Sequence, residues 1–134
     1  MVRTIMRWMI STFYAAAGLA HFVIPEKLIA ITPSWVPFAP QVIFLTGAFE
    51  FTVSIALIGR PFRYWAGIAM AVYAICVWPA NFKHAIDGVD LPYISNSWLY
   101  HGLRLALQPV IAWWALYCAG VTDWPWRDRR NYDA

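Results

Sequence analysis

The stretch IAMAVYAICVW, residues 68–78, carries apolar side chains around the whole circumference of any helix that it forms. A helix of a soluble domain keeps a polar face for water, and this stretch has none. The rest of the chain agrees, because 61% of its 134 residues are hydrophobic, only 13% are charged and the mean hydropathy is +0.52. The composition therefore indicates a membrane protein and disfavours a soluble helical bundle.

Four apolar segments are long enough to cross a bilayer, whose hydrocarbon core takes roughly 20 helical residues. They cover about residues 5–24, 41–59, 62–80 and 98–119. We therefore predict an all-α fold, a four-transmembrane-helix bundle that forms one integral membrane domain over residues 1–134. The first segment also has the basic start and apolar centre of a signal peptide, and we interpret it as the first transmembrane helix.

Positive charges predict the orientation of these helices. With four spans, one side of the membrane receives every arginine except Arg104: Arg3, Arg7, Arg60, Arg63, Arg127, Arg129 and Arg130. Since basic connections stay inside, we predict a multi-pass protein of the cell membrane, of the bacterial inner-membrane type, with both termini cytoplasmic. The net charge of +3 is thus a topology signal and gives no support to nucleic-acid binding.

The connection of residues 25–40, PEKLIAITPSWVPFAP, contains four prolines. Proline is tolerated at the first helical position, so we predict a short helix from Pro25 to about Ile31 and an irregular Pro-rich stretch after it. This segment is predicted to lie at the interface and to cap the outer face of the bundle. Cys76 and Cys118 fall at different predicted depths, which excludes a disulfide between them, and both are predicted to be small core residues.

Polar side chains inside the predicted spans form the candidate site, because such groups are costly in lipid and mark function. One helix face carries His101, Arg104 and Gln108 through i, i+3, i+7 spacing, and the first two spans have similar polar stripes. We predict catalytic roles for Glu50 and His21, and ligand or cofactor binding for Arg104, Gln108, Asn81, His84 and His101. These residues are predicted to share one pocket in the outer half of the bundle, with Glu50 and Arg104 within reach of each other.

Four motifs follow one another along the chain: GLAHFVIPEKLIAITPSWVPF, TGAFEF, VWPANFKHAIDG and RLALQPVIAWWALY. In this order they resemble the DoxX-like small membrane proteins over roughly residues 14–117. The resemblance implies a four-helix membrane bundle and a link to quinone-dependent oxidation of sulfur compounds or to oxidative-stress complexes. The recurrent family positions that match are His21, Pro25, Pro33, Pro37, Gly47, Glu50, Pro79, Ala80, Asn81, Arg104 and Gln108. Ala106 departs from the pattern by replacing an expected proline, and His84 replaces an apolar residue.

Three classes of function stay open at this point. In the first, the pocket binds a quinone-like or other small hydrophobic ligand in redox-associated chemistry, with Arg104 and Gln108 donating hydrogen bonds and His21 or Glu50 exchanging protons. The second is a membrane enzyme that uses Glu50 as the base in acid–base catalysis. The third is a non-catalytic assembly or scaffold subunit. The expected partners are the bilayer, a small hydrophobic ligand, and a redox partner protein or a second copy of the chain.

Two further interpretations concern the same polar residues. Glu50 and Arg104 alone would make a structural ion pair that fixes how the helices pack. Three histidines and one glutamate are also metal-ligand types, but no HxxxH or ExxH pair brings two of them onto one helical turn. Arg104 beside His101 would moreover repel a cation, so a metal centre is less favoured than an organic ligand.

Overall fold

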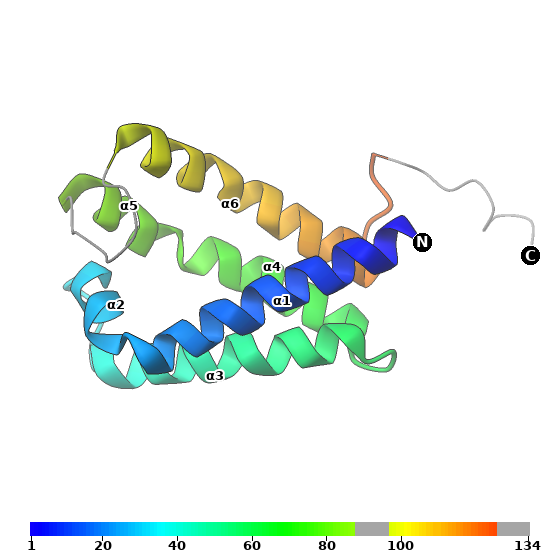
Figure 1. The fold of residues 1–134 in the computed structure, drawn as a ribbon, viewed down its shortest axis with the longest axis horizontal. Coiled ribbons are helices and arrows are strands. Elements are labelled where there is room, and N and C mark those ends of the chain that lie inside the picture. Colours follow the sequence, from blue (N-terminus) through cyan, green and yellow to red (C-terminus); the bar gives the residue numbers. More distant parts are fainter. Residues whose placement is uncertain (88–96, 126–134) are drawn as a thin grey trace, which may run out of the picture.

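The computed structural model describes residues 1–87 and 97–125, and every regular element in these ranges is an α-helix (Figure 1). In chain order the helices are α1 Val2–Val23, α2 Pro25–Ile31, α3 Ala39–Ile58, α4 Arg63–Cys76, α5 Trp78–Asp87 and α6 Trp98–Ala119. The predicted all-α class is confirmed for this part of the chain.

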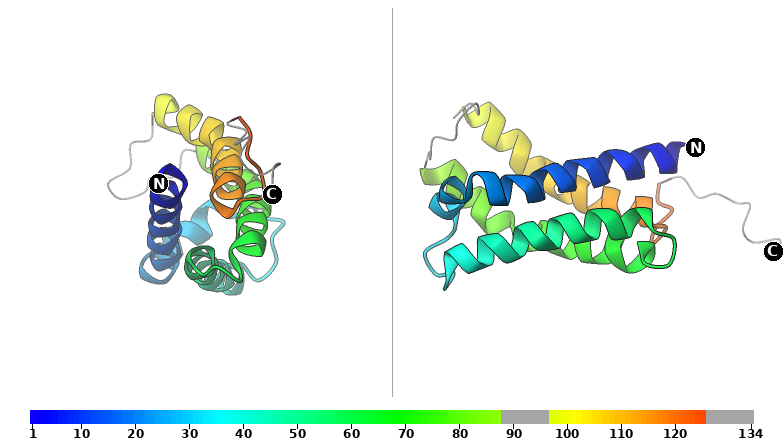
Figure 2. Two further views of the ribbon diagram at one scale, coloured as in Figure 1. Left: turned by 90° about the vertical axis from the view of Figure 1, so that its right-hand side faces the viewer. Right: turned by 60° about the horizontal axis from the view of Figure 1, so that its bottom comes forward.

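The long helices run side by side along the molecule, and α5 extends the rod begun by α4 after a break at Val77 (Figures 1 and 2). Helix α1 packs mainly against α3, and α4 packs mainly against α6. The end that carries α2 and α5 lies opposite the N-terminus and is called the distal end below. Each predicted apolar segment corresponds to one of these rods, with ends that differ by a few residues except where α5 prolongs the third.

Two helical segments are long and apolar enough to cross a membrane, namely α3 and the combined α4–α5 segment Arg63–Asp87. Helices α1 and α2 pass the same criteria only together, and they are bent by 99° at their junction. Helix α6 is not among these candidates, because His101, Arg104 and Gln108 lower its hydropathy. The structure thus supports a membrane protein with two or three candidate spans in the described residues, and four spans stay a prediction.

The bend between α1 and α2 falls where the sequence breaks the helix. Ile24 caps α1 through its backbone N–H, which donates to the carbonyl of Ala20, and Pro25 starts α2 at the first helical position. Turns occupy residues 32–38 between the end of α2 and the start of α3. The predicted short helix and the irregular stretch after it are therefore confirmed.

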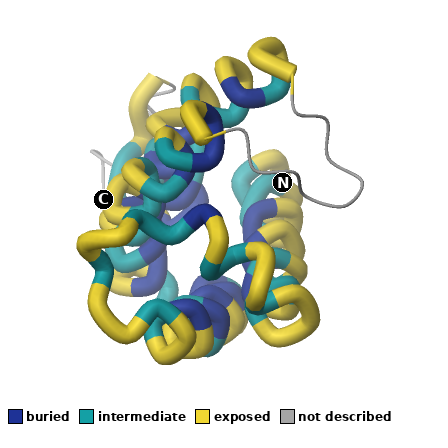
Figure 3. The backbone as a smooth tube through the Cα atoms, turned by 90° about the vertical axis from the view of Figure 1, so that its left-hand side faces the viewer, coloured by how far each residue is buried: buried dark blue, intermediate teal, exposed yellow. Residues whose placement is uncertain are grey.

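The apolar core lies between α1, α3, α4 and α6, away from the distal end. Its fully buried side chains include Ile10, Leu57, Met70 and Cys118. Buried stretches alternate with exposed ones along the long helices, as expected when one face of each helix packs inward (Figure 3). Cys76 is exposed, so its predicted core position is wrong, whereas Cys118 is buried as predicted.

Large apolar side chains also cover the outside of the bundle. Leu45, Trp65 and Leu103 are exposed by 63%, 70% and 59%, and they lie on α3, α4 and α6. Soluble monomers seldom expose contiguous apolar surface of this kind. Lipid contact accounts for these outward faces.

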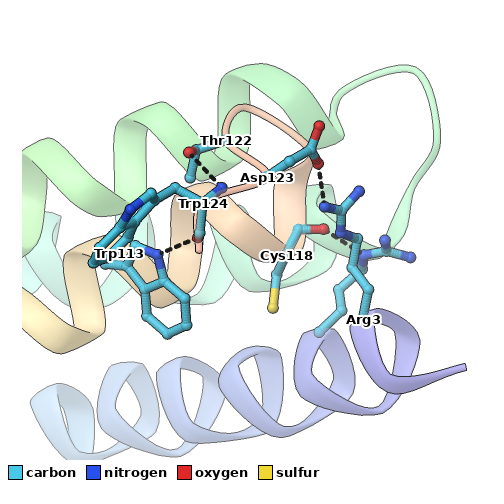
Figure 4. Close-up of polar contacts among 7 residues, drawn as sticks. Arg3, Trp113, Cys118, Thr122, Asp123 and Trp124 are labelled. Carbon is cyan, nitrogen blue, oxygen red and sulfur yellow. Dashed lines mark hydrogen bonds and ion pairs between the residues drawn. The ribbon is translucent and has the colours of Figure 1, made fainter. Parts of the chain in front are cut away.

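The chain after α6 folds back onto the end opposite α2 and α5 (Figure 4). The indole N–H of Trp113 donates to the carbonyl of Trp124, and the Arg7 guanidinium donates to the carbonyl of Cys118. Arg3 forms an ion pair with Asp123 at the same place. These contacts fasten the last described residues to the two ends of α1 and α6 that meet here.

The ion pair between Arg3 and Asp123 is expected to contribute little to stability. Both side chains are substantially exposed, so Arg3→Gln should lower the free energy of unfolding by less than about 1 kcal/mol. Thermal unfolding in detergent micelles measures this, with Arg60→Gln, at an exposed arginine between α3 and α4, as the matched control. A loss of several kcal/mol would show that this end of the molecule depends on the pair.

Candidate functional site

The seven predicted site residues fall into two separate clusters, where the sequence predicted one pocket. The first, called the Glu50 cluster, contains His21 and Glu50. The second, called the α6 cluster, contains Asn81, His84, His101, Arg104 and Gln108. Most of these side chains are buried, and His21 and Arg104 are partly exposed.

The Glu50 cluster joins three helices. The carboxylate of Glu50 on α3 accepts a hydrogen bond of 2.7 Å at Oε1 from the hydroxyl of Tyr73 on α4. Its second oxygen, Oε2, lies 3.2 Å from Nδ1 of His21 on α1. Glu50 is only 6% exposed, so a buried carboxylate is held between a phenol and an imidazole.

The imidazole of His21 lies beside the Glu50 carboxylate but directs its hydrogen bond elsewhere. Nδ1 of His21 is 2.9 Å from the carbonyl oxygen of Ala17, one turn earlier on α1, and a ring N–H at that nitrogen donates to this carbonyl. Oε2 of Glu50 consequently lies at ion-pair distance from the imidazole but accepts no hydrogen bond from the part of the chain that the structure describes.

Two glycines bring α1 and α3 close enough to form this cluster. A Cβ atom on Gly47 would lie 2.5 Å from Cβ of His21, and one on Gly18 would lie 2.9 Å from the carbonyl oxygen of Gly47. Small residues at both positions therefore let the two backbones touch. Gly47 in particular makes the space that His21 occupies beside Glu50.

Tyr73 is the functional residue that sequence reasoning missed. Its ring packs against those of Phe49, with centroids 5.1 Å apart, and Tyr14, at 6.3 Å. The sequence did contain a signal for Tyr73, because this residue carries the only hydroxyl group of the otherwise apolar stretch 68–78. A buried tyrosine hydroxyl needs a partner, and the carboxylate on the neighbouring helix supplies it.

A groove of about 570 Å³ runs between α3 and α4 beside the Glu50 cluster. It is lined by Val42, Leu45, Thr46, Phe49, Ala69, Val72, Tyr73 and Cys76. Only Thr46 and Tyr73 bring hydroxyl groups to it, and the Thr46 hydroxyl donates to the carbonyl of Ile43. The groove thus has apolar walls, with Tyr73 connecting it to the buried carboxylate.

The α6 cluster joins α4, α5 and α6. The amide of Gln108 donates to the carbonyl of Ala74 at 2.6 Å and accepts from Asn81 at 3.1 Å. Arg104, one turn toward the distal end, contacts Nδ1 of His84. His84 in turn packs edge to face with His101, with ring centroids 4.9 Å apart.

The predicted ion pair between Glu50 and Arg104 is wrong. Glu50 contacts Tyr73 and His21, whereas Arg104 contacts His84. The two clusters contact α4 at Tyr73 and Ala74, and consecutive helical residues point about 100° apart. Each cluster therefore occupies its own face of this helix.

The divergence of α1 and α6 separates the clusters further. These helices contact each other near their ends opposite α2, where the Trp114 indole donates to the carbonyl of Met6 and Arg7 reaches Cys118. Toward the distal end they move apart (Figure 1). His21 and Arg104 sit in this diverging part, so the predicted shared pocket does not form.

No group of three or more histidine, cysteine, aspartate or glutamate side chains is placed to hold a metal ion within residues 1–87 and 97–125. His84 and His101 lie together, but Arg104 contacts one of them. The described part of the chain thus offers no assembled metal centre.

The fold and these buried clusters define an all-α protein with helices able to cross a membrane and with polar side chains gathered between them. Residues 10–119 match the model of a family described as domain of unknown function DUF8561, and the chain belongs to that family. The matched region contains both clusters and the groove. Neither a curated protein nor a solved structure matches the sequence.

Proposed function

We propose that the protein is a multi-pass membrane protein that binds a small hydrophobic ligand of the quinone class in the groove between α3 and α4 and exchanges protons with it. The observation that carries this proposal is the position of Tyr73, whose ring lines the groove while its hydroxyl bonds to buried Glu50. An apolar groove with one polar group suits a planar ring that carries carbonyl oxygens. The resemblance to the DoxX-like proteins favours the same ligand class.

Proton exchange follows from the hydrogen bond between Tyr73 and Glu50. An ionised Glu50 accepts from the Tyr73 hydroxyl, whereas a protonated Glu50 donates to the Tyr73 oxygen and leaves the hydroxyl hydrogen for a ligand carbonyl. His21, beside the other oxygen of Glu50, can pass on a further proton because an imidazole titrates near neutral pH. Reduction of a quinone takes two electrons and two protons; in this proposal a redox partner protein supplies the electrons and these side chains the protons.

The proposal includes four membrane spans with both termini in the cytoplasm. Arg3, Arg7, Arg60 and Arg63 lie at the end opposite α2, which supports placing that end inside. Helix α6 is counted as the fourth span because its polar side chains bond to α4 and α5. The groove then lies in the outer half of the membrane.

Filling the groove should weaken ligand binding. Val72 lines it and is 55% exposed, so Val72→Trp is expected to weaken the binding of a short-chain benzoquinone by at least about tenfold, or about 1.4 kcal/mol. Val110→Trp, at a valine of α6 that is 45% exposed, is the matched control and should bind normally. Calorimetric titration of the full-length protein in phosphatidylcholine nanodiscs gives both affinities. Equal affinities in the two variants would reject the groove as the binding site.

The same titration tests proton exchange when it is repeated in buffers of different ionisation enthalpy. Tyr73→Phe should bind about fivefold more weakly, because one hydrogen bond contributes about 1 kcal/mol. Glu50→Gln should bind without the net proton uptake of the wild type, since an amide does not titrate. His21→Gln with unchanged uptake would assign the proton to Glu50 alone. Absence of both binding and uptake in the wild-type protein would favour the assembly or scaffold role.

A further inference from the structure

Arg104 has an environment that the proposed quinone site does not explain. It lies in the second turn of α6, on a different face of α4 from the groove, and its side chain is partly exposed. Its Nη1 contacts Nδ1 of His84, which is 1% exposed. Because a guanidinium only donates hydrogen bonds, Nδ1 of His84 is the acceptor here and carries no proton.

No described carboxylate forms an ion pair with Arg104. Glu50 pairs with His21, Asp87 with Lys83, and Asp123 with Arg3 at the opposite end of the molecule. The Arg104 charge is therefore compensated by no acidic side chain within residues 1–87 and 97–125. A charge inside a membrane bundle normally finds a partner of opposite sign.

The surroundings of Arg104 restrain one side of its guanidinium and leave the other side available. The His84 ring, and the His101 ring 4.9 Å away from it, form a buried wall on one side of the guanidinium. One of the five guanidinium N–H groups is directed to His84. The remaining N–H groups include a parallel pair, which can bind an oxyanion in a bidentate manner.

We propose that Arg104, oriented by His84, binds an anionic oxygen group, a phosphate or a carboxylate, at the distal end of the bundle. His84 fixes the guanidinium through Nδ1, and the ligand occupies the remaining N–H groups. This chemistry has two sources near a membrane surface, the phosphate of a lipid headgroup and a free oxyanion. The site is independent of the Glu50 cluster and of the proposed quinone ligand.

The test uses thermal unfolding of the full-length protein in phosphatidylcholine nanodiscs. One arm replaces chloride in the buffer with inorganic phosphate. The other replaces part of the phosphatidylcholine, whose phosphate is paired with its own choline cation, with phosphatidylglycerol, whose phosphate is not. A rise in melting temperature in the first arm identifies a free oxyanion, and a rise only in the second identifies a lipid headgroup. Either rise should disappear in Arg104→Gln and persist in Arg60→Gln, which removes an exposed arginine between α3 and α4.

Two further variants separate binding from folding. Arg104→Lys keeps the charge but loses the bidentate fork, so the apparent dissociation constant for phosphate, from calorimetric titration, should rise about tenfold while the protein stays folded. Asp90 lies outside the described residues, and Asp90→Asn should leave the response to anions unchanged. Equal responses of wild type, Arg104→Gln and Arg104→Lys would overturn the proposal. A stronger response in Asp90→Asn than in the wild type would show that Asp90 competes with added anions for Arg104, and it would also overturn the proposal.

Discussion

Gly67→Ala is expected to lower the free energy of unfolding by about 3 kcal/mol, because there is no space for even one methyl group at this position. A Cβ atom on Gly67 would lie 2.1 Å from Cβ of Ala119 and 3.0 Å from the carbonyl oxygen of Ala115. Both neighbours belong to α6 and are buried, so α4 and α6 must move apart to accommodate the change. Thermal and denaturant unfolding in detergent micelles measure the loss.

Gly102→Ala is the matched control for this prediction. Gly102 also lies within a helix, yet nothing lies within 4 Å of the position that its Cβ would take. Because alanine is the better helix former, this variant should gain roughly 0.5–1 kcal/mol. Equal effects of the two substitutions would show that α4 and α6 do not pack through Gly67.

Gln108→Leu should destabilise the protein by about 2–4 kcal/mol, because it leaves two buried polar groups without their shared partner. The side chain of Gln108 bonds to Asn81 and to the carbonyl of Ala74, and it is 7% exposed. Leucine has similar bulk but leaves the Asn81 amide and the Ala74 carbonyl without this partner. Gln41→Leu, at an exposed glutamine of α3, is the control and should have little effect. A loss below about 1 kcal/mol would show that water replaces the lost bonds.

A double-mutant cycle separates the hydrogen bonds from packing at this position. Asn81→Leu and Gln108→Leu together should cost less than the sum of the two single variants, since the double variant leaves no unpaired amide. Additive losses would instead indicate that each amide contributes independently.

The sequence alone was enough to predict the helices, because their boundaries depend on local composition. The predicted segment 98–119 coincides with α6 Trp98–Ala119, and Pro25 starts α2 as expected for a residue without a backbone N–H. The break at Val77 was not predicted, because the apolar pattern continues through it. The α4 rod consequently reaches Asp87, beyond the predicted end of the third segment.

The partners of the polar side chains were harder to predict than their positions. Spacing identified the faces that carry Glu50 and Arg104, and both do face other helices. It did not indicate which helices pack together, and α1 pairs with α3 while α4 pairs with α6. That choice depends on tertiary contacts such as those at Gly18 and Gly67, where the absence of a side chain is what matters. Two clusters therefore formed where one was predicted.

The position of the groove on the outside of the bundle determines which concentration matters for a ligand. Leu45, Val72 and Cys76 border it and are exposed on the apolar surface that we assign to lipid contact. A ligand of the proposed class therefore enters sideways from the hydrocarbon, and its occupancy follows its mole fraction in the bilayer. Adding lipid while the total amount of ligand is held constant lowers this mole fraction and should then empty the groove. An apparent aqueous affinity consequently combines two equilibria, partition into the bilayer and transfer from lipid to protein.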